Sequence, residues 1–232
     1  MREGKRIGVV IPALNEEQAI ARVVGDIPDW VDRIVVADNG STDRTAALAG
    51  AAGAVVVSEP APGYGAACLK GIAAQQDCDI IVFMDGDHSD HGDDMQLLVD
   101  PVVAGDCDMV IGSRVLGERE AGSLTPQQRF GNWLATRLIR LFWGVAYTDL
   151  GPFRAIGRPA LERLAMADRD YGWTVEMQVK AAEHDLRVQE VPVRYRRRIG
   201  VSKVAGTLRG TIMAGFKILW VIARHAIALR RR

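Results

Sequence analysis

The stretch Ile80-Ile81-Val82-Phe83-Met84-Asp85-Gly86-Asp87 decides the fold that the sequence predicts. Its first five residues form a short apolar run that indicates a buried strand. Two carboxylates separated by one residue follow where that strand ends. Open α/β sheets bind ligands at the carboxyl ends of parallel strands. Paired carboxylates there favour a divalent cation shared with a phosphate-bearing substrate, although an isolated Asp-x-Asp is more often a solvated turn.

Short apolar runs and helical patterns alternate on either side of this stretch. Strands are predicted at 6–11, 33–37, 54–58, 80–84, 108–111, 153–156 and 186–193. Helices are predicted at 16–27, 42–52, 64–76, 93–104, 127–143, 158–167 and 174–184. Ser41 or Thr42 is the expected cap of the second helix. The alternation predicts an α/β fold with a mainly parallel sheet and helices on both faces.

Polar clusters follow four of the predicted strands. They are Pro12 to Glu17, Asp38 to Asp43, Pro60 to Ala67, and Asp85 to Asp87. Each cluster alone is typical of a turn or a helix cap. Because the ends of parallel strands meet at one edge of a sheet, the four together predict a polar cleft.

Composition limits the domain organisation and the compartment. No Pro/Ser-rich linker divides the chain, so residues 1–210 are predicted to form one domain, followed by a helix in 211–232. The three cysteines, Cys68, Cys78 and Cys107, have no metal-like spacing and fit reduced thiols. The charged first residues do not resemble a secretory signal. We therefore expect a cytoplasmic protein.

Charge is divided between the two ends of the chain, although the net charge is zero. From Arg187 to Arg232 there are 12 basic residues and one acidic residue, which leaves 17 basic and 28 acidic residues elsewhere. This division predicts an anionic partner for the C-terminal part. Within it, Lys217, Arg224 and His225 interrupt the apolar segment Ile212 to Leu229. A membrane-interface helix is therefore favoured over a membrane span, and a terminal helix packed on the core is the alternative.

Several motifs, in this order along the chain, resemble the family-2 glycosyltransferases of GT-A fold, and within them the dolichyl- or polyprenyl-phosphate sugar synthases. They are Pro12-Ala13-Leu14-Asn15-Glu16-Glu17, Asp38-Asn39-Gly40-Ser41-Thr42-Asp43, Asp85-Gly86-Asp87, Ile111-Gly112-Ser113-Arg114, Asp149-Leu150-Gly151-Pro152-Phe153-Arg154 and Arg198-Ile199-Gly200-Val201-Ser202-Lys203. The resemblance covers roughly residues 6 to 210, and six motifs in order are far more specific than one.

The resemblance implies a role for each matched residue. It implies inverting transfer of a hexose from a UDP- or GDP-sugar, with Mg²⁺ or Mn²⁺ held by Asp85 and Asp87. Donor binding falls to Pro12, Leu14, Asn15, Glu16, Asp38, Gly63, Gly65 and Gly86. Acceptor-phosphate binding falls to Arg114, Arg129, Arg198, Ser202 and Lys203. The chain departs from the usual pattern at Leu14, Tyr64 and Ser89, where many relatives carry an aromatic, a basic and a glutamine residue.

The nature of the acceptor decides which catalytic groups are needed. A hydroxyl acceptor requires a general base, for which Asp149 and Glu176 are the candidates. A phosphate monoester is already anionic and requires cations instead. The implied partners are a polyprenyl (dolichyl or undecaprenyl) phosphate, an anionic membrane surface and, as a further candidate, a membrane protein, with no nucleic acid. A soluble-acceptor glycosyltransferase and a non-catalytic nucleotide-sugar-binding module are the alternatives.

Overall fold

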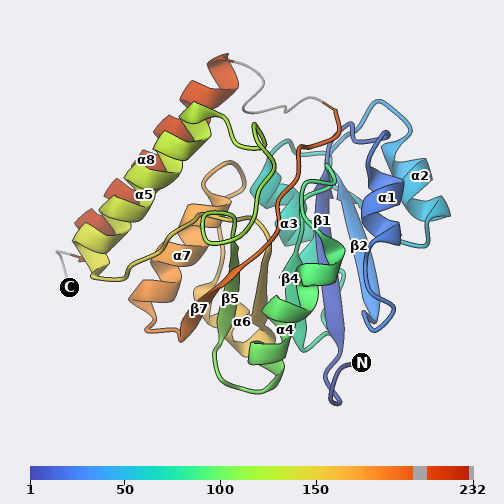
Figure 1. Ribbon diagram of the computed structural model, residues 1–232, viewed down its shortest axis with the longest axis horizontal. Helices are drawn as coiled ribbons and strands as arrows, with labels where there is room; N and C mark the ends of the chain where they lie inside the picture. The colour runs from blue at the N-terminus through green and yellow to red at the C-terminus, as the bar shows by residue number, and fades with distance from the viewer. Residues whose placement is uncertain (201–207, 230–232) are drawn as a thin grey trace.

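The chain forms one seven-stranded sheet with helices on both sides (Figure 1). The computed structural model describes residues 1–200 and 208–229. The strands are β1 Ile7–Ala13, β2 Arg33–Asp38, β3 Val55–Ser58, β4 Ile80–Phe83, β5 Met109–Ser113, β6 Arg154–Gly157 and β7 Val188–Pro192. The helices are α1 Ile20–Gly25, α2 Thr45–Ala51, α3 Tyr64–Ala73, a short 3₁₀ turn Gly92–Asp94, α4 Met95–Val103, α5 Pro126–Trp143, α6 Arg158–Leu164, α7 Trp173–Glu183 and α8 Leu208–Leu229.

The order of strands across the sheet is β3-β2-β1-β4-β6-β5-β7. The pairs β1–β2, β1–β4, β2–β3 and β5–β7 are parallel, whereas β6 runs antiparallel to both β4 and β5. The prediction of an α/β fold with a mainly parallel sheet is confirmed. The central place of β6, far along the chain from β4, was not predicted, because no local pattern encodes this pairing.

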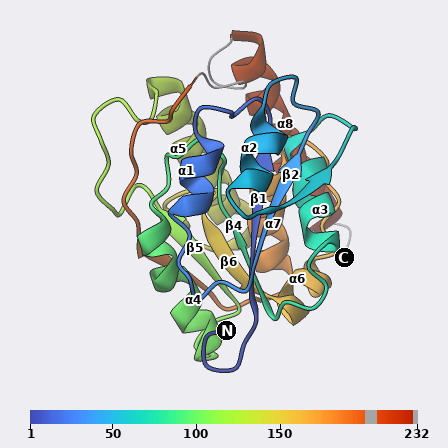
Figure 2. The same ribbon diagram turned by 90° about the vertical axis from the view of Figure 1, so that its right-hand side faces the viewer.

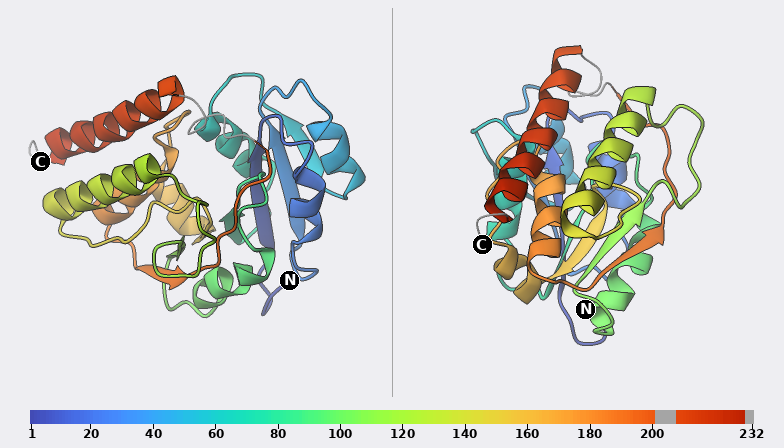
Figure 3. Two further views of the ribbon diagram at one scale, coloured as in Figure 1. Left: turned by 45° about the horizontal axis from the view of Figure 1, so that its top comes forward. Right: turned by 90° about the vertical axis from the view of Figure 1, so that its left-hand side faces the viewer.

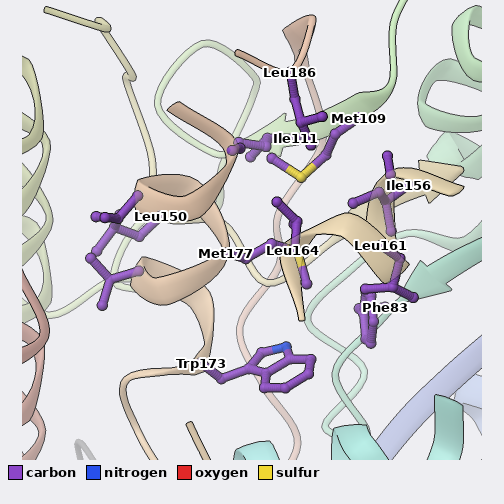
Figure 4. Packing of buried hydrophobic residues seen from close by; sticks show 14 of the residues in the cluster. Phe83, Met109, Ile111, Leu150, Ile156, Leu161, Leu164, Trp173, Met177 and Leu186 are labelled. Atoms are coloured by element: carbon purple, nitrogen blue, oxygen red, sulfur yellow. The ribbon is translucent and has the colours of Figure 1, made fainter. Parts of the chain in front are cut away.

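Helices lie on both faces of the sheet (Figure 2), and each face contributes to a separate hydrophobic core. Side chains alternate along the strands, so Phe83 of β4 enters one core while Val82 enters the other. The first core packs against α3, α5, α6, α7 and α8, and the second against α1, α2 and α4. In the first core, the Phe83 and Trp173 rings meet edge to face with centroids 5.9 Å apart, within the cluster shown in Figure 4.

Two N-terminal helices are shorter than predicted, and the cap expected for one of them is wrong. No side-chain hydrogen bond caps α2, which begins at Thr45. Ser41 instead accepts the backbone N–H of Asn15, and Asn15 Oδ1 accepts the N–H of Thr42. These polar side chains therefore join the loop after β1 to the loop after β2. Glu16 likewise begins a turn that precedes α1 at Ile20.

The helices α5 and α8 lie against each other on the side of the molecule opposite α1 and α2 (Figures 1 and 3). Local sequence explains the limits of α5. Thr125 and Gln128 form a reciprocal capping box, and Pro126 occupies the first turn. Gly144 ends the helix in the left-handed conformation, at φ 74°.

Candidate active site

The Asp-Gly-Asp segment lies directly after β4 and brings its two carboxylates to the edge of the sheet where β1 and β2 also end. Asp85 Oδ1 accepts a hydrogen bond from the hydroxyl of Tyr64, at 3.0 Å. Burial, and after it the charge of Asp87, raises the pKa of Asp85 to about 6, against the lowering effect of the Tyr64 hydrogen bond. From the sequence, Tyr64 was only a departure from the family pattern, and the structure shows it contacting a predicted metal ligand.

Asp87 is buried and held in one orientation by its neighbours. Its Oδ1 accepts hydrogen bonds from the backbone N–H of Ser89 at 3.0 Å and from the Ser89 hydroxyl at 2.6 Å. Its Oδ2 lies 3.2 Å from Nη1 of Arg198. Ser89 is therefore a residue that orients Asp87. This contact is an Asx-type turn, in which an aspartate side chain accepts the backbone N–H of the residue two positions further on. The spacing of Asp87 and Ser89 in the sequence is compatible with such a turn.

Asp90 is a third carboxylate beside the pair, and sequence reasoning missed it. It is fully buried, and its Oδ2 accepts the backbone N–H of Asp85 at 3.3 Å. Within the described residues its Oδ1 has no hydrogen-bond partner. Burial, with the charges of Asp85 and Asp87, raises the pKa of Asp90 well above its ordinary value. The only signal in the sequence was one more acid after the motif.

The residues predicted to bind the donor lie along the ends of β1 and β2. Pro12 pairs in register with Ala37, one residue before Asp38. Asp38 is buried, and of its carboxylate oxygens Oδ2 accepts the N–H of Ser41 whereas Oδ1 has no partner among the described residues. Leu14 and Asn15 are half-buried in the following loop.

Two further predicted donor residues connect this edge to the acidic pair. Gly86 packs against the end of β1, because a Cβ there would lie 3.4 Å from the carbonyl oxygen of Pro12. Glu16 is buried, and its Oε1 accepts a hydrogen bond from Arg198 at 2.9 Å. The structure thus brings Pro12, Glu16 and Asp38 to the same edge of the sheet as the Asp85–Asp87 segment, which contains Gly86.

Gly63 and Gly65, on either side of Tyr64, face the backbone of Asp168 and Arg169. A Cβ on Gly63 would lie 2.0 Å from the carbonyl oxygen of Arg169, and one on Gly65 would lie 2.1 Å from that of Asp168. The backbone of Ala66 donates to Arg169. The two glycines therefore allow the loop before α7 to contact the first turn of α3. This contact explains why glycine occupies both positions, and it does not test their predicted role in donor binding.

A segment from Val193 to Gly200, which we call the crossing segment, runs over the acidic pair. Its backbone donates from Arg196 to Ser89 and from Ile199 to Asp87. Arg196 also donates to the carbonyl of His88 at 2.5 Å. Arg198 then contacts both Glu16 and Asp87, so one guanidinium bridges a predicted donor residue and a predicted metal ligand.

The other predicted acceptor residues have different surroundings. Arg114 donates from Nε and Nη2 to the two oxygens of Asp149, each at 2.8 Å, and lies over the Tyr195 ring. Burial alone would lower the pKa of Arg114, but the Asp149 carboxylate outweighs burial and raises it. Arg129 is exposed on the first turn of α5. Ser202 and Lys203 lie outside the described residues.

The two predicted general bases are engaged in other contacts. Asp149 is fully buried, and both its oxygens bind Arg114. Glu176 is 5% exposed, accepts backbone N–H groups of Ala167 and Asp168, and forms an ion pair with Lys180 at 2.9 Å. Neither carboxylate is free to receive a proton from an acceptor hydroxyl in this arrangement.

The fold and this site define a nucleotide-sugar-dependent transferase, and the chain belongs to glycosyl transferase family 2, whose family model matches residues 8–165. It is 38% identical to an uncharacterized glycosyltransferase of Mycobacterium tuberculosis over 213 residues, which cover 91% of this chain and 95% of that protein. It is 29% identical to the polyprenol monophosphomannose synthase of Mycolicibacterium smegmatis over 235 residues, which cover 89% and 84% of the two chains. The chain is a hexosyltransferase of this family.

The chain also resembles a solved structure, the glucosyl-3-phosphoglycerate synthase of Mycobacterium tuberculosis in complex with Mn²⁺, UDP and glucosyl-3-phosphoglycerate. The TM-score is 0.78 and the identity 26%, and the match covers 96% of this chain and 80% of the other. The same enzyme has been solved with Mg²⁺ and UDP. The GT-A expectation is confirmed, and these neighbours bind a divalent metal together with a nucleotide.

Proposed function

We propose that this enzyme transfers a hexose, with inversion, from a UDP- or GDP-sugar to a polyprenyl phosphate at the cytoplasmic face of the membrane. One observation carries the choice of acceptor: Arg198 reaches the acidic pair, while both predicted general bases are buried in other contacts. Arg198 binds Asp87, and Arg114 covers Asp149. A phosphate monoester brings its own negative charge, so it needs guanidinium partners and no base.

Donor binding is assigned to the strand-end residues. Asp38 leaves a buried oxygen, within the described residues, that can accept a hydrogen bond from a nucleoside. Across residues 1–200 and 208–229, no three His, Cys, Asp or Glu side chains form a complete metal cage. Asp85 and Asp87 fit Mg²⁺ or Mn²⁺ nonetheless, because such an ion commonly uses one or two carboxylates and completes its shell with substrate phosphates and water. When bound, the ion would neutralise charge that develops on the leaving diphosphate.

The protein's own groups then have distinct tasks. Tyr64 and Ser89 orient Asp85 and Asp87 through their hydroxyl hydrogen bonds. Arg198, now bound to Glu16 and Asp87, would exchange these carboxylates for the acceptor phosphate when metal and donor occupy the cleft. The acceptor oxygen would attack the anomeric carbon on the face opposite the leaving diphosphate, which gives inversion.

A soluble phosphorylated acceptor is the second candidate function. The observation that favours it is the likeness to glucosyl-3-phosphoglycerate synthase, whose structure contains a small phosphorylated product. The same arginines would serve a free phosphate as well as a lipid phosphate. Only the identity of the product separates the two reactions.

The test is a transfer assay with labelled UDP- and GDP-hexoses in Mn²⁺ or Mg²⁺. We expect label to enter the organic phase with undecaprenyl or dolichyl phosphate, and none to enter it with the matched polyprenol, which lacks the phosphate. Label that appears instead only in an aqueous product of 3-phosphoglycerate would replace the proposal with the second candidate. Transfer to the polyprenol itself would contradict the role of the arginines.

Arg198 provides a sharper test of the acceptor site. Arg198→Gln is expected to raise the KM for polyprenyl phosphate about tenfold or more, since a charge-assisted hydrogen bond is lost. The Kd for the nucleotide-sugar should change less. Arg197→Gln is the matched control, because Arg197 lies next in sequence but bonds the carbonyl of Ala121, away from the cleft. A larger effect of Arg198→Gln on the nucleotide-sugar would move Arg198 into the donor site.

A further inference from the structure

The outer surface of α5 and α8 carries large apolar side chains that are exposed to solvent. We call this surface the α5/α8 face and define it by seven exposed residues: Phe130, Trp133 and Leu141 of α5, and Ile212, Phe216, Trp220 and Ile227 of α8. Phe216 is 67% exposed and Leu141 is 72% exposed. Along each helix these residues follow a helical repeat, so they form one outward stripe per helix. Exposed aromatic and aliphatic side chains gathered on adjacent helices mark an interaction surface.

The opposite sides of both helices are fixed to the domain. Ala135 and Ile139 of α5, and Val221 and Ile222 of α8, are buried in the same hydrophobic core. Two polar contacts also hold α8: Lys217 forms an ion pair with Asp168 at 2.9 Å, and Nδ1 of His225 lies 3.1 Å from a carboxylate oxygen of Glu183. The alternative of a terminal helix packed on the core is therefore confirmed for one side of α8, and the other side is exposed.

This packing argues against a membrane span. Ile212–Leu229 is long and apolar enough to cross a bilayer by length and composition. To cross it, however, α8 would have to leave α5 and α7, expose Val221 and Ile222, and break the pairs with Asp168 and Glu183. A helix that stays packed on the domain can meet a membrane only along its interface, with its exposed side.

The charges on these two helices all have one sign. Neither Pro126–Trp143 nor Leu208–Leu229 contains an aspartate or a glutamate. Arg137 lies over the Trp133 ring at 5.8 Å, and Arg224 lies over the Trp220 ring at 5.4 Å. Tryptophan and arginine side by side suit the headgroup region of a bilayer, where rings enter the acyl boundary and cations meet phosphates.

We propose that the α5/α8 face docks the enzyme flat on an anionic membrane, with both helices in the interface. The charges favour this partner over a second copy, because a symmetric dimer through this face would set basic side chains against each other. This docking surface rests on the proposed function, because docking on a membrane serves an enzyme whose acceptor is a lipid phosphate. Both helices begin near the edge of the sheet where β1 and β4 end (Figure 1), so docking would hold the cleft beside lipid phosphates.

The test measures binding of the full chain to sedimenting vesicles of phosphatidylcholine with and without phosphatidylglycerol. Trp133→Ser and Phe216→Ser, one on each helix, should each weaken binding to the anionic vesicles about tenfold, the effect of withholding a large apolar side chain from the bilayer. Leu97→Ser is the matched control, because Leu97 is 42% exposed on α4, outside the α5/α8 face. Arg137→Gln should reduce binding mainly at low salt, and Arg22→Gln, an exposed arginine on α1, should not.

Point variants are preferred to removal of α8, because removal would take Val221 and Ile222 out of the core and uncover the residues that they pack against. Alkaline carbonate should release the bound protein, and resistance to it would establish a span and overturn interfacial docking. Equal binding of wild type and Phe216→Ser to the vesicles would also overturn interfacial docking. A protein that sediments as a dimer and does not bind vesicles would overturn it as well. An effect of Phe216→Ser without one of Trp133→Ser would exclude α5 and overturn the two-helix surface.

These results are separable from those on the proposed function. If docking is correct, both serine variants should still transfer sugar to a short, water-soluble prenyl phosphate at the wild-type rate. Normal vesicle binding without transfer to any polyprenyl phosphate would reject the proposed acceptor and leave the docking surface intact. Loss of transfer to the soluble analogue in the variants would show that the face is part of the acceptor site, contrary to the proposal.

Discussion

The hydroxyl of Tyr64 and the carboxylate of Asp85 form a contact that joins the first turn of α3 to the Asp85-Gly86-Asp87 motif. The charge of Asp87 also acts on Asp85, and the buried Asp90 lies beside both. Three acids so close together repel one another unless a cation or hydrogen bonds offset their charge. The donors around them, Tyr64 and Arg198 among them, therefore determine how the carboxylates are presented to a metal ion.

We expect Tyr64→Phe to weaken Mn²⁺ binding roughly fivefold, the effect of one hydrogen bond worth about 1 kcal/mol. The ring remains, so the packing of α3 should be kept. Metal binding is measured by the paramagnetic signal of free Mn²⁺ in the presence of nucleoside diphosphate. Tyr147→Phe is the control, because its hydroxyl bonds the carbonyl of Gln178. Equal Mn²⁺ affinity in wild type and Tyr64→Phe would show that the hydroxyl does not orient Asp85.

The raised pKa of Asp85, at about 6, predicts how stability depends on pH without metal. Above pH 6 the folded protein holds an ionised carboxylate that burial disfavours. This cost to stability falls as the pH drops below 6 and is gone only below the ordinary pKa of 3.8. Asp85→Asn cannot ionise. In chelator, its free energy of unfolding should exceed that of wild type by on the order of 1–3 kcal/mol at pH 8, and by roughly half as much at pH 5.

Denaturant titrations at the two pH values provide the measurement. Asp29→Asn, which removes an exposed carboxylate away from the cleft, controls for the change of side chain. A stability difference between wild type and Asp85→Asn that is the same at pH 5 and pH 8 would contradict the raised pKa.

Sequence predicted the residues of the site that lie in motifs, and the structure brings Glu16, Asp38, Asp85 and Asp87 to one edge. The sequence did not predict contacts that depend on tertiary packing. Arg114 and Asp149 are 35 residues apart and each was assigned a separate role, yet they form one buried pair. Asp90 was missed because its importance comes from burial, which a single acid in a polar run does not indicate.

At the scale of elements, the contact between α3 and the loop before α7 depends on the lack of a side chain at Gly65. We expect Gly65→Ala to lower the free energy of unfolding by about 1–3 kcal/mol, because its methyl group would meet the carbonyl of Asp168. Gly131→Ala, within α5, should be neutral or stabilising by up to about 1 kcal/mol, because a methyl group there would point into open space. Thermal unfolding of both variants measures these changes. An unchanged free energy of unfolding in Gly65→Ala would contradict the close packing.

Elements with strong local patterns were predicted well, and those with long-range partners were not. The helix expected at 127–143 is α5, with a capping box in its sequence. The helix expected at 42–52 starts three residues later, since Asn15 from another loop binds Thr42 and Ser41. The direction of β6 could not be predicted either, because its neighbours β4 and β5 are set by the whole fold.

Across the whole molecule, the acidic first part and the basic last part of the sequence meet at the cleft. The crossing segment carries Arg196 and Arg198 over the Asp85–Asp87 loop, where they bind Asp26, Glu16 and Asp87. The charge division thus has two consequences: basic residues of the last part close the cleft with internal ion pairs, and α8 contains no acidic residue. Binding in the cleft should therefore act on the stability of the entire domain.

We expect a divalent metal and a nucleoside diphosphate to stabilise the protein together and much less when added singly, because Asp85 and Asp87 provide only part of a coordination shell. At a ligand concentration of 100 times Kd, the gain is about 2.7 kcal/mol. For a domain of this size that corresponds to a rise of about 5–10 °C in Tm. Thermal unfolding with UDP and GDP, each with Mn²⁺ or with chelator, measures the rise and indicates the preferred nucleotide. Asp87→Ala should abolish the part that depends on metal while the variant remains folded, as circular dichroism will verify. An equal rise in chelator, or in Asp87→Ala, would show that the nucleotide binds without the ion and remove the metal from the proposed chemistry.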